Sequence, residues 1–409
     1  MGPPGTTRTP HPAVFGILCL PFGVTTGFVS VALAYLATRS GLTVQQGAVL
    51  VAANLFPQVL KFLWAPIVDI SLSRRKWYAA ASAVGAVSIY FCATVPLGPS
   101  HFLLLEGLIL VMSLASSFVG FAIEGLLAHL TAPEDRGRVS GWYQAGNLGG
   151  SGLGGGLGLW LLIHFARWEA GLGMAAFVLL PLPALFLLRD VPAESPDASV
   201  GRAIGNVARD VWAAVRTRIG ILSLLLCFVP IGTGTASSVL SQAEVADYWR
   251  VGAGTVALIQ GTLAGVISMA GCIVGGYGCT RIGARAAYAV YGGLMALTTA
   301  TMALLPATPA IYIAGNFAYC WVTGLCYAAF SAFVLDAIGA GNAATKYNAF
   351  ASLSNFPIWY MGLVLAWAET HFGPRGMLYT EAACGAAGIL VFLAVAALPF
   401  GRRAAALPA

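Results

Sequence analysis

The sequence predicts an all-α membrane protein of twelve transmembrane helices in two pseudo-symmetric six-helix halves. Three observations support this fold class: the composition, the number and length of the apolar stretches, and a repeat between the two parts of the chain. Of the 409 residues, 58% are hydrophobic and only 9% are charged, and the mean hydropathy is +0.82. A soluble domain carries about 25% charged residues because its surface faces water, so most of this surface must face lipid.

Twelve apolar stretches are long enough to cross a bilayer, which takes about 20 helical residues. We expect these spans near residues 14–37, 45–68, 77–97, 102–130, 140–165, 170–189, 219–245, 255–279, 285–305, 308–336, 346–368 and 377–400. The polar segment between the sixth and seventh spans contains an amphipathic run that should lie along the membrane surface. The predicted units are an N-terminal half (1–190), a cytoplasmic linker (191–218) and a C-terminal half (219–409).

The loops predict the orientation, because cytoplasmic loops carry an excess of lysine and arginine. With both termini inside, 16 basic residues are cytoplasmic, and the outer side holds only Arg39, Arg167, Arg250 and Arg375. We therefore expect an even number of spans and cytoplasmic termini. The alanine-, glycine- and arginine-rich composition favours a bacterial inner membrane.

The two halves resemble each other at an offset of about 212 residues. Thr43 before the second span corresponds to Thr255 before the eighth, and the basic turn at 69–76 corresponds to the turn at 276–285. Two six-helix halves in a parallel repeat are typical of major facilitator transporters, whose substrate site lies between the halves near the bilayer midplane. Chance similarity between apolar helices is the alternative, but the linker falls at the expected place.

Lys61 is the first candidate for a functional charge. It lies about eight residues, or about 12 Å, from the cytoplasmic end of the second span. A buried ammonium group is costly in a membrane, so it should face a cavity or a partner and bind an anionic group or form a gating ion pair. Alternatively, Lys61 extends along its own stem to the interface.

Two carboxylates occupy equivalent helices of the two halves. Glu124 lies in the fourth span and Asp336 in the tenth. A carboxylate in a low-dielectric site can exchange a proton near neutral pH, which would suit a proton-coupled transporter. The alternative is a structural ion pair with Arg74, Arg136 or Arg138. Glu106 and Glu381 lie near the outer ends of their helices, and we expect them at the interface.

The other predicted pathway residues are polar and aromatic, and most should face a cavity or another helix because polar groups are costly in hydrocarbon. They are Asn54, Gln58, Tyr143, Gln144, Tyr347, Asn348, Asn355 and Trp359. Such a cavity would suit a bulky, partly polar solute. Tryptophan and tyrosine belts at the membrane interfaces would explain some of them equally well.

A glycine ladder runs through the fifth span, with Gly146, Gly150, Gly154 and Gly158 at every fourth position. Small residues at this spacing let membrane helices pack backbone to backbone. The ladder differs from the Gly-Pro signature of proton antiporters, which counts against an exporter.

A cytoplasmic gate is predicted from charged residues at helix ends: Asp69, Arg74, Arg75, Arg136, Arg138 and Lys346. Asp69 and the following bases resemble the major facilitator motif between helices two and three, whose charge contacts hold the inward-closed state. The usual glycine and Asp-Arg pair of that motif are absent. A plain positive-inside loop is the alternative for the three bases.

Two stretches carry a narrower resemblance. The run from Lys61 to Asp69, KFLWAPIVD, is similar to the K-F-L-W-x-P-x-x-D segment of the AmpG-type muropeptide permease and acetyl-CoA transporter-like branch. The run from Ala344 to Ala349, ATKYNA, resembles its A-T-Q-Y-A-L segment, with Lys346 in place of glutamine.

The resemblance implies proton-driven import of a bulky solute. Muropeptide permeases often carry two additional C-terminal helices, and with an end at Ala409 the size fits short siderophore permeases better. The substrate therefore stays open between a siderophore and a cell-wall peptide or sugar-peptide.

Other classes of function are disfavoured. The eight cysteines lie singly within apolar segments, without metal-ligand spacing, so we expect no cofactor and no metal. The basic residues form no stripe for nucleic acid. No Ser/Lys, Asp/Asp or HExxH constellation indicates an intramembrane enzyme, and a receptor would need a larger soluble part. The expected partners are a small-molecule solute, a coupling proton and the lipid bilayer, and the protein should work as a monomer.

Overall fold

The computed structural model describes residues 10–42, 44–193, 201, 205, 209, 212, 228–338, 347, 350–351 and 353–397. Every regular element in these ranges is helical. Most of the predicted linker, 191–218, lies outside the described residues, as do Lys346, Asn348 and Thr43.

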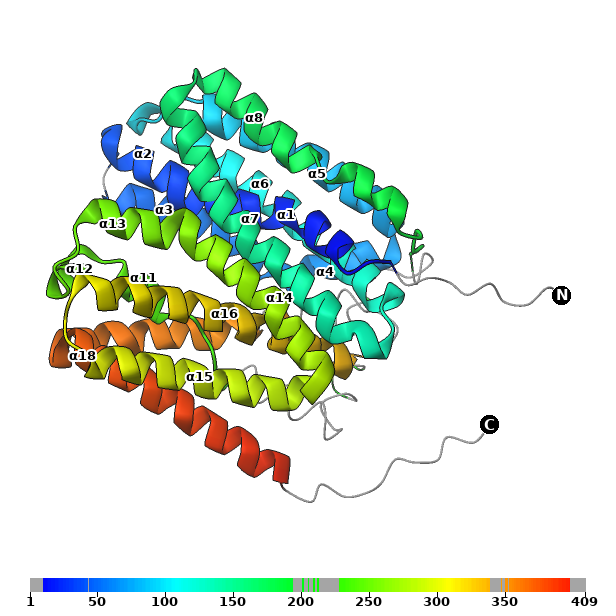
Figure 1. Cartoon of the computed structure of the whole chain (residues 1–409). Helices are drawn as coiled ribbons and strands as arrows, with labels where there is room; N and C mark the ends of the chain where they lie inside the picture. The colour runs from blue at the N-terminus through cyan, green and yellow to red at the C-terminus, as the bar shows by residue number, and fades with distance from the viewer. Residues whose placement is uncertain are drawn as a thin grey trace, which may run out of the picture.

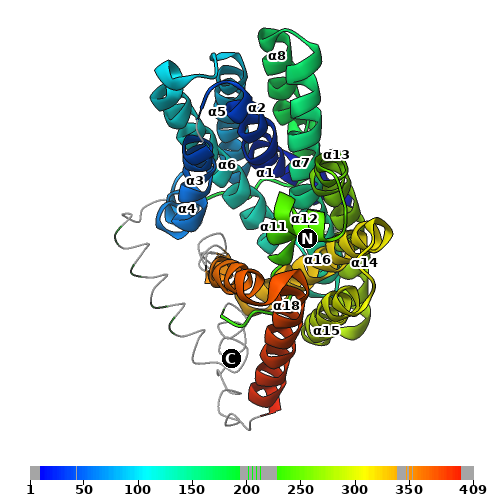
Figure 2. The same ribbon diagram turned by 90° about the vertical axis from the view of Figure 1, so that its left-hand side faces the viewer.

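The first helix group forms the blue-to-green part of the molecule in Figures 1 and 2. Its elements are α1 (Ala13–Gly27), η1 (Phe28–Leu33), α2 (Ala34–Arg39), α3 (Val44–Val59), α4 (Lys61–Ile70), α5 (Arg74–Thr94), η2 (Pro99–His101), α6 (Phe102–Leu130), η3 (Pro133–Asp135), α7 (Arg136–His164), α8 (Arg167–Leu179) and η4 (Leu182–Leu187). The helix continues from α1 through the π-helical turn η1 into α2, so these three elements form one span.

The second helix group forms the green-yellow to red part of the molecule. Its elements are α11 (Ala236–Leu240), α12 (Ala243–Tyr248), α13 (Ala253–Leu258), η5 (Ile259–Leu263), α14 (Ala264–Ile282), α15 (Ala284–Leu304), α16 (Pro309–Ile338) and α18 (Asn355–Ala397). A π-helical turn, η5, again interrupts a span here.

Within the described residues, eight helical stretches are long and apolar enough to cross a membrane, and nine if the bent pair α3–α4 counts as one span. α7 is not among them, although it is 29 residues long, because glycine fills much of its sequence. α18 has 43 residues and a break at Gly373. A straight helix of that length would be about twice as long as a bilayer is thick, so α18 contains two of the predicted spans. The all-α membrane fold is confirmed, whereas the count of twelve stays a prediction.

The second span is broken between α3 and α4. Its two parts, 49–58 and 63–70, meet at an angle of 48°. Pro57 lacks a backbone N–H and clashes with the preceding turn, and Leu60, between the two helices, is not helical (φ −95°, ψ 10°). Lys61 is therefore the first residue of a new helix.

The glycine ladder lets α7 pack directly on α1. A Cβ atom on Gly146 would lie 2.1 Å from the carbonyl oxygen of Gly16, and one on Gly154 would lie 2.1 Å from that of Val24. On its other side α7 packs against α14, where a Cβ on Gly265 would lie 2.5 Å from Cα of Gly152. This confirms the predicted packing role of the ladder and makes α7 the central contact between the two helix groups (Figure 1).

The helix groups close against each other at one end, where α5 and α7 begin with Arg74 and Arg136; we name it the basic end. A buried apolar cluster there combines residues of both groups. Its members include Phe15, Tyr78 and Leu126 from the first group and Val334, Leu335, Tyr347 and Phe350 from the second.

Candidate solute cavity

A cavity of about 530 Å³ lies between the two helix groups. Solute sites in proteins are typically clefts of about 300–1,000 Å³ with mostly apolar walls and a few polar groups. Eight of the predicted pathway residues line it: Gln58, Lys61, Glu124, Tyr143, Gln144, Tyr347, Asn355 and Trp359. Tertiary structure thus brings together residues from α3, α4, α6, α7 and the second group.

Lys61 and Glu124 contribute a positive and a negative charge to the wall of this cavity. Lys61 is 8% exposed and Glu124 is 3% exposed. The break before α4 places Lys61 at the cavity, and its ammonium group lies within electrostatic reach of the Glu124 carboxylate. The hydroxyl of Tyr143 donates a hydrogen bond to Oε1 of Glu124 at 2.8 Å. Such a pair can receive a solute that carries both an anionic and a hydrogen-bonding part.

A polar bridge crosses the cavity wall from one helix group to the other. Nε2 of Gln144 donates to Oγ of Ser331 at 2.5 Å, and the hydroxyl of Tyr347 donates to the same oxygen at 3.0 Å. The rings of Tyr143 and Tyr347 meet edge to face with centroids 6.3 Å apart. The sequence offered no signal for Ser331, because one serine in an apolar helix is unremarkable.

Two predicted pathway residues lie elsewhere. Asn54 is buried, and its carbonyl oxygen accepts a hydrogen bond from Oγ of Ser113 at 2.5 Å, so it packs α3 against α6. Asp336 is 46% exposed and forms an ion pair with Arg136 at 2.9 Å. Neither belongs to the residues that line the cavity. Asp336 follows the ion-pair alternative, because α16 extends past the buried part of the bundle before it reaches this residue.

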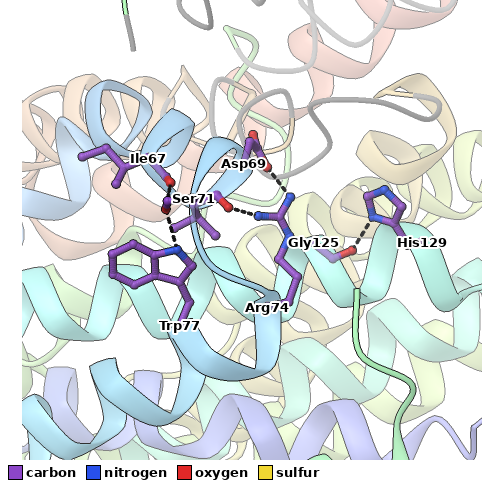
Figure 3. A network of polar contacts seen from close by, with 8 residues as sticks. Ile67, Asp69, Ser71, Arg74, Trp77, Gly125 and His129 are labelled. Atoms are coloured by element: carbon purple, nitrogen blue, oxygen red, sulfur yellow. Dashed lines mark hydrogen bonds and ion pairs between the residues drawn. The ribbon is translucent and has the colours of Figure 1, made fainter. Parts of the chain in front are cut away.

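The basic end holds a buried charge network around Arg74 (Figure 3). Nη2 of Arg74 donates to Oδ1 of Asp69 at 2.5 Å, and the two side chains are 0% and 1% exposed. Nη1 of Arg74 donates to the carbonyl oxygen of Val68. A Cβ atom at Gly125 would lie 2.6 Å from Nε of Arg74, so any other residue there would have to displace the guanidinium group.

The other predicted gate residues that the structure describes, Arg75, Arg136 and Arg138, also lie at the basic end. Arg136 pairs with Asp336 across the helix groups, and the guanidinium carbon of Arg138 lies 5.7 Å from the centroid of the Tyr277 ring on α14. The backbone N–H of Arg75 donates to Oδ1 of Asp190 at 3.2 Å, which fixes the chain after η4 to the start of α5.

Glu381 differs from the sequence-based expectation of an interfacial residue. It is only 5% exposed, and its Oε1 accepts a hydrogen bond from the hydroxyl of Tyr319 at 2.6 Å. Its position a few residues inside the predicted span suggested the interface, whereas the structure buries it beside Tyr319 of α16. Among the described residues, no group of three His, Cys, Asp or Glu side chains is placed to hold a metal ion.

Comparisons with known proteins agree with this architecture. A family model described as Major Facilitator Superfamily matches residues 13–359. The anhydromuropeptide permease of Escherichia coli K12 is 24% identical over 357 residues, which cover 84% of this chain and 72% of the permease. Two solved structures superpose with TM-scores of 0.69. The human organic anion transporter MFSD10 is 16% identical, covering 95% of this chain and 100% of its own; the E. coli fucose:proton symporter FucP is 15% identical, covering 94% and 98%.

Proposed function

Because the chain belongs to the Major Facilitator Superfamily, we propose that it imports a bulky anionic solute of the muropeptide type by alternating access, coupled to protons. The observation that carries this proposal is the cavity between the helix groups, with buried Lys61 and Glu124 in its wall. The superfamily consists of transporters, so a transported solute is the natural occupant of this space.

The chemistry of the wall supports the solute class. A lysine ammonium group at the cavity attracts a carboxylate, and the amides of Gln58, Gln144 and Asn355 can hydrogen-bond to sugar hydroxyls or peptide groups. Trp359 adds an aromatic surface for an apolar or sugar face. A sugar-peptide offers all three kinds of group. The similarity to an anhydromuropeptide permease points to the same class.

The proposed working cycle uses both ends of the molecule. Units 1–190 and 219–409 would rock about the contact between α7 and α14, joined by the linker 191–218. The charge contacts at the basic end would hold that end closed, and the termini and basic loops would face the cytoplasm of a bacterial cell. Glu124, next to Lys61 at the cavity, would exchange the coupling proton, and one chain would be sufficient for transport.

Uptake by intact cells tests the proposal. Cells that express the protein receive labelled anhydromuropeptides or labelled ferric siderophores, with and without a protonophore. We expect uptake of the anhydromuropeptide that the protonophore abolishes and that Lys61→Ala reduces by at least about tenfold, since loss of a charged hydrogen bond weakens binding by about 1.5–3 kcal/mol. Lys76→Ala, at an exposed lysine, is the matched control.

The other outcomes would indicate a different substrate, a different direction of transport or a different solute site. Uptake of the ferric siderophore alone would indicate that the protein is a short siderophore permease. Lower accumulation than in empty cells would indicate an exporter of the same fold. Equal uptake by Lys61→Ala and the parent would remove Lys61 from the solute site.

A further inference from the structure

The second helix group contains a buried carboxylate that the cavity site does not use. Glu381 lies on α18 and is 5% exposed. Its Oε1 accepts the hydrogen bond from Tyr319, whereas its Oε2 is buried and has no hydrogen-bond partner among the described residues. No lysine, arginine or histidine in the described part of the chain forms an ion pair with it. A permanently charged carboxylate in this place would be very unfavourable.

A non-helical segment before α11 forms one side of this site. Residues 228–235 are not helical, and Gly232 and Gly234 have φ angles of +63° and +72°, which favour glycine. The chain also passes very close to α16, because a Cβ on Gly232 would lie 2.5 Å from Sγ of Cys326. The N–H of Ala236, just after the break, donates to the Tyr319 hydroxyl at 3.0 Å. That hydroxyl is thereby oriented to donate to Glu381.

Tyr319 also connects Glu381 to open space between the helix groups. It lines a second cavity of about 190 Å³, together with Val31 and Ser151 of the first group. Ser237 and Gln260 also line this cavity. Oγ of Ser237 donates to Oε1 of Gln260 at 2.7 Å, and Nε2 of Gln260 donates to Oδ1 of the buried Asn316 at 2.6 Å. Polar side chains of α11 and η5 therefore share this cavity with Tyr319, whose hydroxyl contacts Glu381.

Within the part of the chain that the structure describes, few other titratable groups influence Glu381. Tyr319 is its hydrogen-bond donor, and Cys384 lies one turn further along α18. α11 has no ionisable side chain. The titratable residues of α15 are directed elsewhere: the hydroxyls of Tyr288 and Tyr291 donate to Ile231 and Gly275, and the guanidinium group of Arg285 lies over Phe333. Protonation of Glu381 would therefore remove a buried negative charge that no ion pair among the described residues balances.

We propose that Glu381 is a proton-binding site of the second helix group, which exchanges its proton with the cavity between the groups through the hydroxyl of Tyr319. The site rests on the geometry above; its use for coupling rests on the proposed transport function. It would place a titrating carboxylate in each helix group, Glu124 in the first and Glu381 in the second.

Infrared spectroscopy of the purified full-length protein tests the site without any solute. The C=O stretching absorption of protonated carboxyl groups is followed while the pH is changed. We expect Glu381→Gln to lose one titrating carboxyl band that the parent and the control Glu106→Gln retain. Glu106 is a suitable control because it lies on spanning helix α6 and is only partly buried. If Glu381→Gln and the parent give the same titrating bands, the proposal is wrong.

A second variant keeps the test decisive if Glu381→Gln does not fold. Tyr319→Phe keeps the carboxyl group and removes its donor, so the Glu381 band should shift in frequency and titrate at a different pH; an unchanged band would refute the proposed link. Where the parent takes up a solute, Glu381→Gln should also lose the protonophore-sensitive part of that uptake. Absence of solute uptake by the parent would count against the proposed function and leave the infrared result to decide the site.

Discussion

Asp69 and Arg74 form a charge pair that is almost completely removed from solvent, at 1% and 0% exposure. Two charges at such a depth are stable only with good geometry and further hydrogen bonds. The bond from Arg74 to the carbonyl oxygen of Val68 supplies one of these. The pair fixes the turn between α4 and α5, at the opposite end of α4 from Lys61.

We predict that Asp69→Asn destabilises the protein by about 3–5 kcal/mol, because it leaves the buried Arg74 charge without its counter-charge. Thermal and denaturant unfolding of the purified protein in detergent would measure this. The control is Asp135→Asn, whose partner Arg138 lies 3.4 Å away at the surface. That change should cost less than about 1 kcal/mol. Equal effects of the two variants would contradict the prediction.

At the scale of one helix, α6 joins the cavity to the basic end. Glu124 lines the cavity, and the next residue, Gly125, lies against the side chain of Arg74. Neighbouring residues of a helix point in directions about 100° apart, so one turn of α6 serves both sites. A movement of α6 would therefore change the cavity and the charge network at the same time.

Gly125→Ala should destabilise the protein by about 1–3 kcal/mol, because the new Cβ forces a fully buried arginine to move. Gly107→Ala is the matched control on the same helix, since nothing lies within 4 Å of its Cβ position. Alanine favours a helix over glycine by about 0.5–1 kcal/mol, so the control should be neutral or slightly more stable. Unfolding midpoints of the two variants decide the matter, and a stabilised Gly125→Ala would refute the proposed crowding.

At the scale of the whole molecule, we expect contacts between the helix groups to determine which end is closed. The ion pair of Arg136 with Asp336 joins the groups at the basic end, and its side chains are 26% and 46% exposed. A pair with this exposure contributes about 0–1 kcal/mol to stability. Such a contact can bias a conformational equilibrium without holding the fold together.

Charge reversal tests this role. Arg136→Asp and Asp336→Arg should each increase hydrogen exchange of the backbone around residues 133–140, because like charges then face each other and the basic end opens more often. The double variant should restore the exchange rate of the parent, since it rebuilds the pair with reversed charges. Each unfolding free energy should change by about 1 kcal/mol or less. A double variant that exchanges as fast as the single variants would exclude the pair as a contact of the closed state.

The sequence by itself determined the solvent, the helical class and the family architecture of this protein. These depend on composition and on the length of apolar stretches, which a bilayer constrains tightly. The stretch from Lys61 to Asp69 could also be identified from its two charges and its proline, Pro66. Charges in apolar helices are conspicuous against their surroundings.

Only the tertiary structure decided which polar residues share a site. Glu124 and Asp336 occupy equivalent helices, yet one lines the cavity and the other pairs with Arg136 at the basic end. Glu381 was expected at the interface but is buried against Tyr319. The physical reason is that a sequence fixes which residues lie on a helix, whereas the rotation, the breaks and the packing of each helix against its neighbours decide where their side chains point.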